Sequence, residues 1–401
     1  MSQRPYRILP VIIFSQFAGT SLWFAGNAVL ADLQRRWGLP DETLGDMTAA
    51  VQFGFIAGTL TFAFFAISDR YSPRKIFFLC SLFGALSNAA IYLLGGELWP
   101  LLTLRFATGF FLAGIYPIGM KIASGWYQRD LGKALGFLVG ALVLGTAFPH
   151  LIRGLGQTLP WEAVMLSVSA IALLGGVLMF ALVPDGPHLR KGSGFDPRSL
   201  AVVFRSSQFR ASSFGYFGHM WELYAFWAFV PSLLAAYATR TTETDVNISL
   251  YSFAVIAAGA LGCVAGGLVS LRLGSARVAF AQLLASGVCC LVSPLLFYAS
   301  APVFIAYLLF WGIVVVGDSP QFSALNAQYA PGELVGSALT IANSIGFGIT
   351  IFSIQLLNYA AGFVGAQYLF LLLIPGPILG LLALMPLLRP ARSGAAAQGQ
   401  R

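Results

Sequence analysis

The residues of this sequence most suited to chemistry are charged side chains that stand inside long apolar stretches. They include Arg105, His219, Glu222 and Asp318. A charge in such surroundings costs free energy unless it is paired or hydrated, so each of these residues indicates a functional site. His219 and Glu222 are three residues apart, which places them on one face of a helix, close enough to pair or to exchange a proton. We therefore predict that all four residues take part in proton coupling, with Glu222 as the first candidate.

A structural interpretation of each residue stays open beside the functional one. His219 and Glu222 could cap a helix at an interface, Asp318 could belong to a hydrated kink at Pro320, and Arg105 could pair with an acidic group or bind an anion. The coupling hypothesis is favoured because a carboxyl group in apolar surroundings binds a proton more readily than one in water, and it responds to a nearby imidazolium.

A second group of polar and aromatic residues predicts a binding site for a solute. Pro320 interrupts an apolar stretch beside Asp318, and Pro117 interrupts another beside Tyr116, at an offset of 203 residues. Paired interruptions of this kind are typical of a transport site near the bilayer midplane. Aromatic rings there can stack on an organic solute, although they could equally face lipid, and Lys121 could instead extend to the membrane surface. The predicted substrate-binding residues are Trp23, Tyr116, Lys121, Trp221, Tyr224, Trp227, Asp318 and Gln321.

The composition places these residues in a membrane protein. Of 401 residues, 58% are hydrophobic and 9% are charged, whereas about 25% of a soluble domain is charged. A helix needs about 20 apolar residues to cross a bilayer. The sequence therefore predicts an all-α membrane protein with twelve transmembrane helices, near residues 9–31, 47–68, 76–95, 99–120, 134–154, 162–183, 211–237, 248–270, 278–299, 302–326, 334–358 and 366–388.

The basic residues predict how the chain is oriented. Lys and Arg concentrate on the short loops that stay in the cytoplasm. If the N-terminus lies inside, the outer loops hold only Arg35, Arg36, Arg153 and Arg240, and the remaining basic residues of the loops and ends are cytoplasmic. We expect a multi-pass protein of the inner or plasma membrane with both termini in the cytoplasm. The formal charge of +8 then reflects topology and does not indicate nucleic-acid binding.

An internal repeat divides the chain into two halves. Ser68-Asp69-Arg70 follows the second apolar stretch and Ser270-Leu271-Arg272 follows the eighth, at an offset of 202 residues. Tyr116-Pro117 and Ser319-Pro320 match at an offset of 203. Matches in one order at nearly one spacing indicate a duplicated unit. The predicted domains are an N-terminal six-helix bundle at 1–183, a cytoplasmic linker at 184–208, a C-terminal six-helix bundle at 209–390 and a disordered tail at 391–401.

Two short motifs resemble signatures of the major facilitator superfamily. Asp69, Arg70 and Arg74 fit the loop signature Gly-x-x-x-Asp-Arg-x-Gly-Arg-Arg/Lys of that family, and Arg105 with Gly109 fits its Arg-x-x-x-Gly signature. The resemblance extends over almost the whole chain. It implies two pseudo-symmetric six-helix bundles that rock about a site at the midplane, with Arg105 as a buried charge tied to proton translocation.

The loop signature also predicts a gate. Asp69 can pair with a neighbouring base or a helix N-terminus, forming a latch between the bundles that must break when the inner side opens. Simple anchoring of the basic residues at the membrane surface remains the alternative. In the second copy Leu271 replaces the acid, so the latch should be asymmetric. The predicted residues of the cytoplasmic gating loops are Asp69, Arg70, Arg74, Lys75, Arg272 and Arg277.

The sequence predicts a transporter and no enzyme. It contains no phosphate-binding loop, zinc pattern or nucleophile elbow, so we expect no cofactor, no metal and no ATP hydrolysis. We predict a monomeric secondary transporter in the lipid bilayer that moves a small polar or anionic solute by alternating access, coupled to protons. Two alternatives remain. One is a drug or metabolite efflux antiporter, although Ala141 and Leu144 depart from the antiporter signature. The other is a non-transporting sensor or assembly factor of the same fold.

Overall fold

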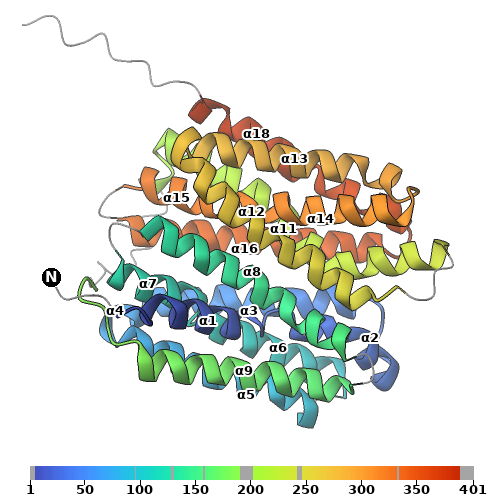
Figure 1. Ribbon diagram of the computed structural model, residues 1–401, viewed down its shortest axis with the longest axis horizontal. Coiled ribbons are helices and arrows are strands. Elements are labelled where there is room, and N and C mark those ends of the chain that lie inside the picture. The colour runs from blue at the N-terminus through green and yellow to red at the C-terminus, as the bar shows by residue number, and fades with distance from the viewer. Residues whose placement is uncertain are drawn as a thin grey trace, which may run out of the picture.

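The computed structural model describes residues 5–94, 96–127, 131–156, 159–189, 202–241, 246–331 and 334–388, with the backbone alone at 131–133. All regular elements in these ranges are helical (Figure 1). The first half contains α1 (Ile8–Thr20), α2 (Ala25–Trp37), α3 (Thr43–Phe64), α4 (Ile67–Arg70), α5 (Pro73–Leu94), α6 (Leu98–Leu112), α7 (Tyr116–Trp126), α8 (Leu131–Leu155) and α9 (Trp161–Leu182). The second half contains α11 (Ser207–Thr241), α12 (Ile248–Leu273), α13 (Ser275–Leu296), α14 (Ala301–Gly317), α15 (Ser319–Tyr329), α16 (Val335–Ala360), α17 (Ala366–Leu369), the 3₁₀ helix η2 (Phe370–Leu373) and α18 (Pro375–Leu388).

The predicted all-helical architecture is confirmed. Within the described ranges, eleven helical segments are long and apolar enough to cross a membrane. We assign the twelfth crossing to α11, which at 35 residues is the longest of the described helices. It falls below the hydropathy of the others because His219, Glu222 and several Trp and Tyr residues lie along it. Residues 190–201 of the predicted linker and the whole predicted tail lie outside the described residues.

Four of the membrane-crossing segments are interrupted, three of them by a break between two helices and the last by the 3₁₀ helix η2. The breaks at 113–115 and at Asp318 precede α7 and α15, each of which has proline in its first turn. Proline suits a first turn because it lacks the N–H that a helix interior requires. These two interruptions were predicted from Pro117 and Pro320. The third break, at 21–24 between α1 and α2, contains no proline and was not predicted.

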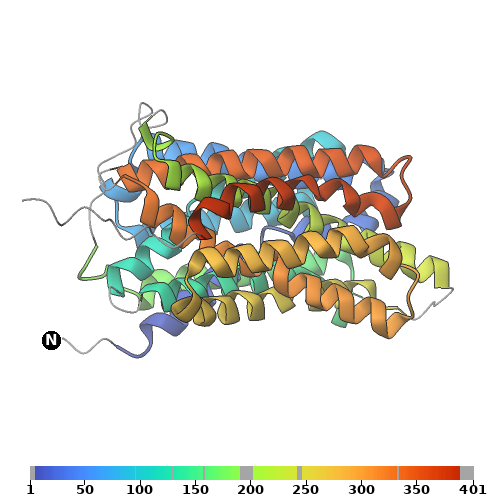
Figure 2. The same cartoon turned by 90° about the horizontal axis from the view of Figure 1, so that it is seen from above.

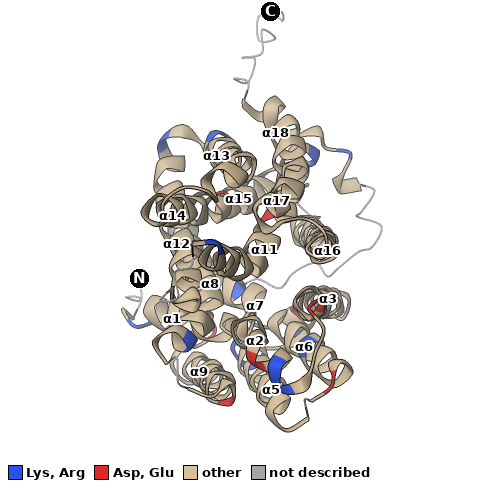
Figure 3. Ribbon diagram, turned by 90° about the vertical axis from the view of Figure 1, so that its right-hand side faces the viewer, with Lys and Arg blue, Asp and Glu red and all other residues tan. Residues whose placement is uncertain are grey.

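Both halves use glycine to bring helices into close contact. A Cβ on Gly109 of α6 would collide with the backbone oxygen of Val51 on α3. A Cβ on Gly312 of α14 would collide in the same way with Val255 on α12. The equivalent pairs of helices are therefore packed backbone to backbone in the two halves, as expected for a repeated unit. Figure 3 shows the two groups of helices from one end, with α8, α12, α3 and α16 along the boundary between the halves.

The hydrogen bonds that connect the two halves lie at one end of the molecule. We call the end with α4 and the turn at Gly274 the basic end, and the other end the opposite end; they lie left and right in Figures 1 and 2. Four hydrogen bonds between described residues connect the halves, and all lie at the opposite end. At the basic end, Gly136 of α8 and Gly336 of α16 have open space where a Cβ would stand.

Two amide clasps form these connections. In the α3–α16 clasp, the Oδ1 atom of Asn358 accepts a hydrogen bond from the backbone N–H of Gly45 at 3.2 Å. Its Nδ2 atom donates to the backbone oxygen of Glu42 at 2.9 Å. Beside it, Gln355 donates to Asp46 Oδ1 at 3.0 Å. In the α8–α12 clasp, Asn247 donates to the backbone oxygen of Gly154 at 2.8 Å. The contacts between the halves at this end are therefore made mainly by uncharged groups.

Candidate functional site

An aromatic layer fills the interface between the halves near the middle of the helices. Trp23, in the break of the first segment, lies 5.6 Å from the ring of Tyr224 and 5.6 Å from that of Phe347. Phe55 of α3 lies 4.4 Å from Phe347. The structure thus brings together three residues predicted to bind substrate, namely Trp23, Tyr224 and Trp227, all of them buried. The aromatic layer consists of Trp23, Phe24, Phe55, Tyr224, Trp227 and Phe347.

Arg105 holds the break that carries Trp23. Its guanidinium is fully buried, donates from Nη1 to the backbone oxygen of Leu22 at 3.2 Å, and donates from Nη2 to that of Trp23. Nη1 also donates to Asn88 Oδ1 at 3.2 Å, and the amide of Asn88 donates to Ser169 Oγ at 3.0 Å. Carbonyl groups exposed by a helix break need donors, and a buried cation needs acceptors, so each satisfies the other. Arg105 therefore fixes the backbone position of Trp23.

His219 and Asp318 form a buried pair in the second half. His219 Nδ1 of α11 lies 2.8 Å from Asp318 Oδ1 in the break between α14 and α15, and both side chains are 1% exposed. The pair is a close charge contact, and none of the side-chain N and O atoms of His219 and Asp318 forms a hydrogen bond of regular geometry with the described residues. The His219 ring packs against Tyr216 and Phe322, with ring centroids 6.1 and 5.7 Å away. An imidazole and a carboxyl group at this distance can share, gain or lose a proton while remaining in contact.

Glu222 occupies a different place from the one predicted. We expected it to pair with His219, but its Oε1 instead accepts hydrogen bonds from Ser286 Oγ and, at 3.0 Å, from Trp311 Nε1. Cys290 Sγ lies 3.4 Å from the same oxygen. The difference arises because residues three apart on a helix still diverge in direction, so His219 points to α15 while Glu222 points to α13 and α14. Glu222 is thus a buried carboxyl group held by neutral donors inside the second half.

Two predicted substrate-binding residues lie away from the interface. Lys121 of α7 donates to the backbone oxygen of Ser68 at 2.6 Å and pairs with Asp69, so its ammonium group belongs to the basic end of the first half. Trp221 points toward the last segment, where its Nε1 donates to the backbone oxygen of Leu372 at 3.2 Å. Tyr116, by contrast, is the first residue of α7, directly after the break at 113–115, and is partly buried. Gln321 is buried one turn after Asp318.

Among the described residues, the contacts of Asp69 and Arg74 lie within the first half, and the latch between the halves stays a prediction. Asp69 pairs with Lys121, and Arg74 donates to the backbone oxygen of Phe180 at 3.4 Å while its guanidinium lies over the Phe180 ring. These contacts all stay within the first half, because the short helix α4 directs Asp69 toward α7. Arg70, Lys75 and Arg272 are exposed.

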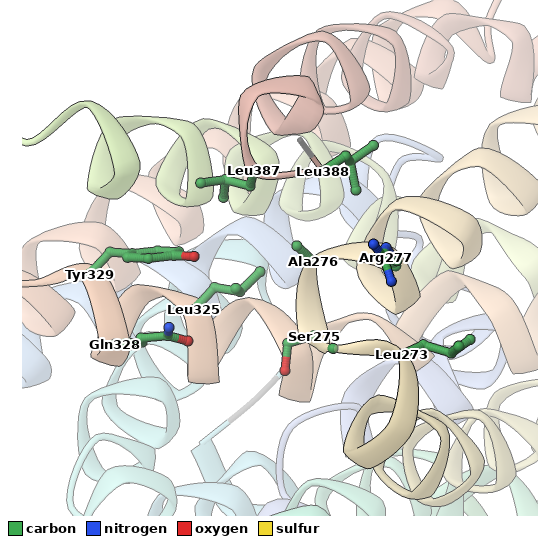
Figure 4. Close-up of a pocket in the computed structure, with 10 residues that line it drawn as sticks. Leu273, Ser275, Ala276, Arg277, Leu325, Gln328, Tyr329, Leu387 and Leu388 are labelled. Atoms are coloured by element: carbon green, nitrogen blue, oxygen red, sulfur yellow. The ribbon is translucent and has the colours of Figure 1, made fainter. Parts of the chain in front are cut away.

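Arg277, the last predicted gating residue, lines a pocket at the basic end of the second half. Figure 4 shows the pocket between the α12–α13 turn and the ends of α15 and α18. Its volume is about 320 Å³. Leucine side chains from these elements, together with Tyr329 and Gln328, complete the lining. The pocket is built by the second half alone and is separate from the aromatic layer.

The sequence analysis missed several uncharged polar residues of the interior, although it included Gln321. Gln16 of α1 and Gln52 of α3 are fully buried, and neither side-chain amide has a partner among the described residues. Asn88, Ser286 and Trp311 support Arg105 and Glu222. A signal was available, because an amide inside an apolar stretch is costly in the same sense as a charge.

Comparisons with known proteins agree with this architecture. The family model of the Major Facilitator Superfamily matches residues 11–351. The fold is similar to that of the proton:xylose symporter XylE, with a TM-score of 0.74 at 14% identity over 96% of both chains. It is also similar to the human organic anion transporter MFSD10, with a TM-score of 0.70 at 17% identity over 95% of this chain and 100% of that one. The chain belongs to the Major Facilitator Superfamily and is a multi-pass membrane transporter, not an enzyme.

A curated relative matches part of the sequence. The D-galactonate transporter of Escherichia coli O6:H1 is 24% identical over 164 residues. The match covers 40% of this chain and 37% of the relative. The fold of the nucleoside transporter NupG is similar as well, with a TM-score of 0.72 at 10% identity over 95% of this chain and 100% of that one.

Proposed function

We propose that the protein moves a small polar or anionic solute across the cytoplasmic membrane by alternating access, driven by protons. The observation that carries the coupling proposal is the contact between His219 Nδ1 and Asp318 Oδ1 at the α14–α15 break. A buried pair of this kind changes its charge when it gains or loses one proton, and a change of buried charge favours one conformation over another. Glu222 is a second candidate for the coupled proton, because it is a buried carboxyl group in contact with α13 and α14.

The solute proposal combines the site with the relatives. Galactonate, xylose and nucleosides all carry several hydroxyl groups on a small frame, and these are the solutes named for similar proteins. The aromatic layer offers flat apolar surfaces, while the tyrosines, His219 and Asp318 offer hydrogen bonds. Such a mixture of rings and a few polar groups suits a polyhydroxylated solute. In the proposed orientation the basic end faces the cytoplasm, and the clasps close the outer side.

Transport by the purified protein in proteoliposomes tests the proposal. A panel of D-galactonate, D-xylose, uridine and the lipophilic cation tetraphenylphosphonium is assayed for exchange across the membrane and for accumulation driven by a pH gradient. We expect exchange and accumulation of at least one polyhydroxylated solute. Asp318→Asn should keep exchange and lose accumulation, because the amide cannot take up the proton. Glu97→Gln, which alters an exposed carboxyl group, is the matched control and should behave as wild type.

Each alternative gives a different result. Exchange of tetraphenylphosphonium alone would identify an efflux antiporter for lipophilic cations. A protein that exchanges no solute from the panel would contradict the transport proposal and favour the sensor hypothesis. Accumulation by Asp318→Asn at the wild-type level would remove Asp318 from the coupling step while leaving transport itself intact.

A further inference from the structure

Gln16 is a buried amide for which the described residues supply no hydrogen-bond partner. Its side chain is 0% exposed, and neither Oε1 nor Nε2 has a hydrogen-bond partner among the described residues. The hydroxyl of Thr20, one turn away, donates to the backbone oxygen of Gln16 at 2.8 Å and leaves the amide unsatisfied. Buried polar groups without partners are costly, so such groups usually meet water or a ligand.

The fold makes room for this amide beside a broken helix. Oε1 of Gln16 faces Gly119 on α7, one turn after Tyr116, and a Cβ at that position would collide with the oxygen. Only glycine allows the amide to lie so close to α7. Gln16 is therefore placed next to α7, in the interrupted segment of the first half that carries Tyr116.

The internal repeat relates Gln16 to the coupling pair. An offset of 203 residues brings Gln16 onto His219, Ile115 onto Asp318 and Gly119 onto Phe322. The contacts follow the same relation, since His219 packs on Phe322 as Gln16 packs on Gly119. The two halves thus present equivalent sites with different chemistry. The second half has a pair of ionisable groups, and the first has an uncharged amide, with Ile115 at the position equivalent to Asp318.

We propose that Gln16 hydrogen bonds to the transported solute and selects for adjacent hydroxyl groups. An amide offers one acceptor and one donor side by side, which a pair of neighbouring hydroxyls can satisfy at once. A carboxylate of the solute cannot satisfy both, because it would bring its oxygens against Oε1. Solute recognition then belongs to the first half and proton binding to the second. This inference rests on the proposed transport function and specifies how its site distinguishes solutes.

The test uses Gln16→Leu, which removes both polar groups at similar volume. The probe is whichever of D-galactonate, D-xylose and uridine the wild-type protein exchanges. We expect the half-saturating concentration for exchange to rise about tenfold or more, while the melting temperature without solute stays level or increases. Ser15→Ala is the matched control. It removes an unpartnered buried hydroxyl on the α9 side of the same helix, and it should leave the half-saturating concentration unchanged.

The outcomes separate the inference from the function on which it rests. If wild type exchanges none of the three probes, the polyhydroxylated solute class is wrong, and the inference falls with it. If wild type exchanges a probe and Gln16→Leu does so with wild-type affinity, the inference alone is overturned. A lower melting temperature for Gln16→Leu also overturns it, because the amide is then structural. Gln16→Asn, which keeps the amide but shortens it, should fold normally and still weaken binding.

Discussion

The guanidinium of Arg105 on α6 donates a hydrogen bond to the backbone oxygen of Trp23, in the break between α1 and α2. A side chain of the α6–α7 segment therefore stabilises the break in the first segment. The family resemblance implies a role for this arginine in proton translocation. The geometry supports a positioning role, since the contacts of Arg105 go to two carbonyl groups and the uncharged Asn88. Trp23 in turn belongs to the aromatic layer that joins the halves.

Substitution of Arg105 should therefore change binding more than coupling. In Arg105→Gln the carbonyl groups of Leu22 and Trp23 lose charged donors, each worth about 1.5–3 kcal/mol. We expect solute affinity to fall by about tenfold or more, with the ratio of accumulation to exchange unchanged. Exchange kinetics and pH-driven uptake measure the two quantities. Arg36→Gln, at an exposed arginine, is the control. Selective loss of accumulation with normal affinity would contradict this view.

Glu222 should respond to substitution as a coupling residue, as the sequence suggested. In Glu222→Gln the group can no longer take up or release a proton, so we expect accumulation to be lost and exchange to remain. Ser286→Ala provides a comparison, because it removes one hydrogen bond to Glu222 and leaves the carboxyl group. It should cost about 1–3 kcal/mol of stability without abolishing accumulation. Wild-type accumulation by Glu222→Gln would exclude Glu222 from coupling.

The ion pair between Lys121 and Asp69 should be structural and modest in strength. Its side chains are 21% and 18% exposed, and partly exposed pairs contribute about 1 kcal/mol or less. Lys121→Met should therefore lower the melting temperature slightly and leave the half-saturating solute concentration within about twofold of wild type. Exchange and thermal unfolding assays measure both. A large loss of solute affinity would instead show that Lys121 binds the solute, as the sequence predicted.

The clasps should control how often the opposite end opens. Asn358→Ala removes two hydrogen bonds to the first half, each worth about 1 kcal/mol. We expect a shift toward an arrangement open at that end. Spin labels at Asp41 and Gly362, on either side of the α3–α16 clasp, should report longer distances. Ser353→Ala is the control, because its hydroxyl bonds within α16. An unchanged distance distribution in Asn358→Ala would show that the clasp does not hold this end.

Local sequence patterns predicted much of the fold. They did not predict which site residues contact each other. Apolar runs located the crossings, and Pro117 and Pro320 located two breaks, because these signals lie within a few residues of the feature. The break at 21–24 is stabilised by Arg105, which is more than 80 residues away in the sequence. The residues around this break contain no proline or other local pattern that would predict it. Asp318 meets His219 only after two helices pack, so spacing along α11 pointed to Glu222 instead.

The two clasps share one property, which is that side chains of the second half bind mainly to backbone atoms of the first. Asn358 meets the main chain at Glu42 and Gly45, and Asn247 meets it at Gly154. A backbone donor or acceptor is present whatever side chain stands there, provided that Gly45 and Gly154 stay small enough to admit their neighbours. The balance between the open and closed states can thus be adjusted by single substitutions in one half, without a compensating change in the other.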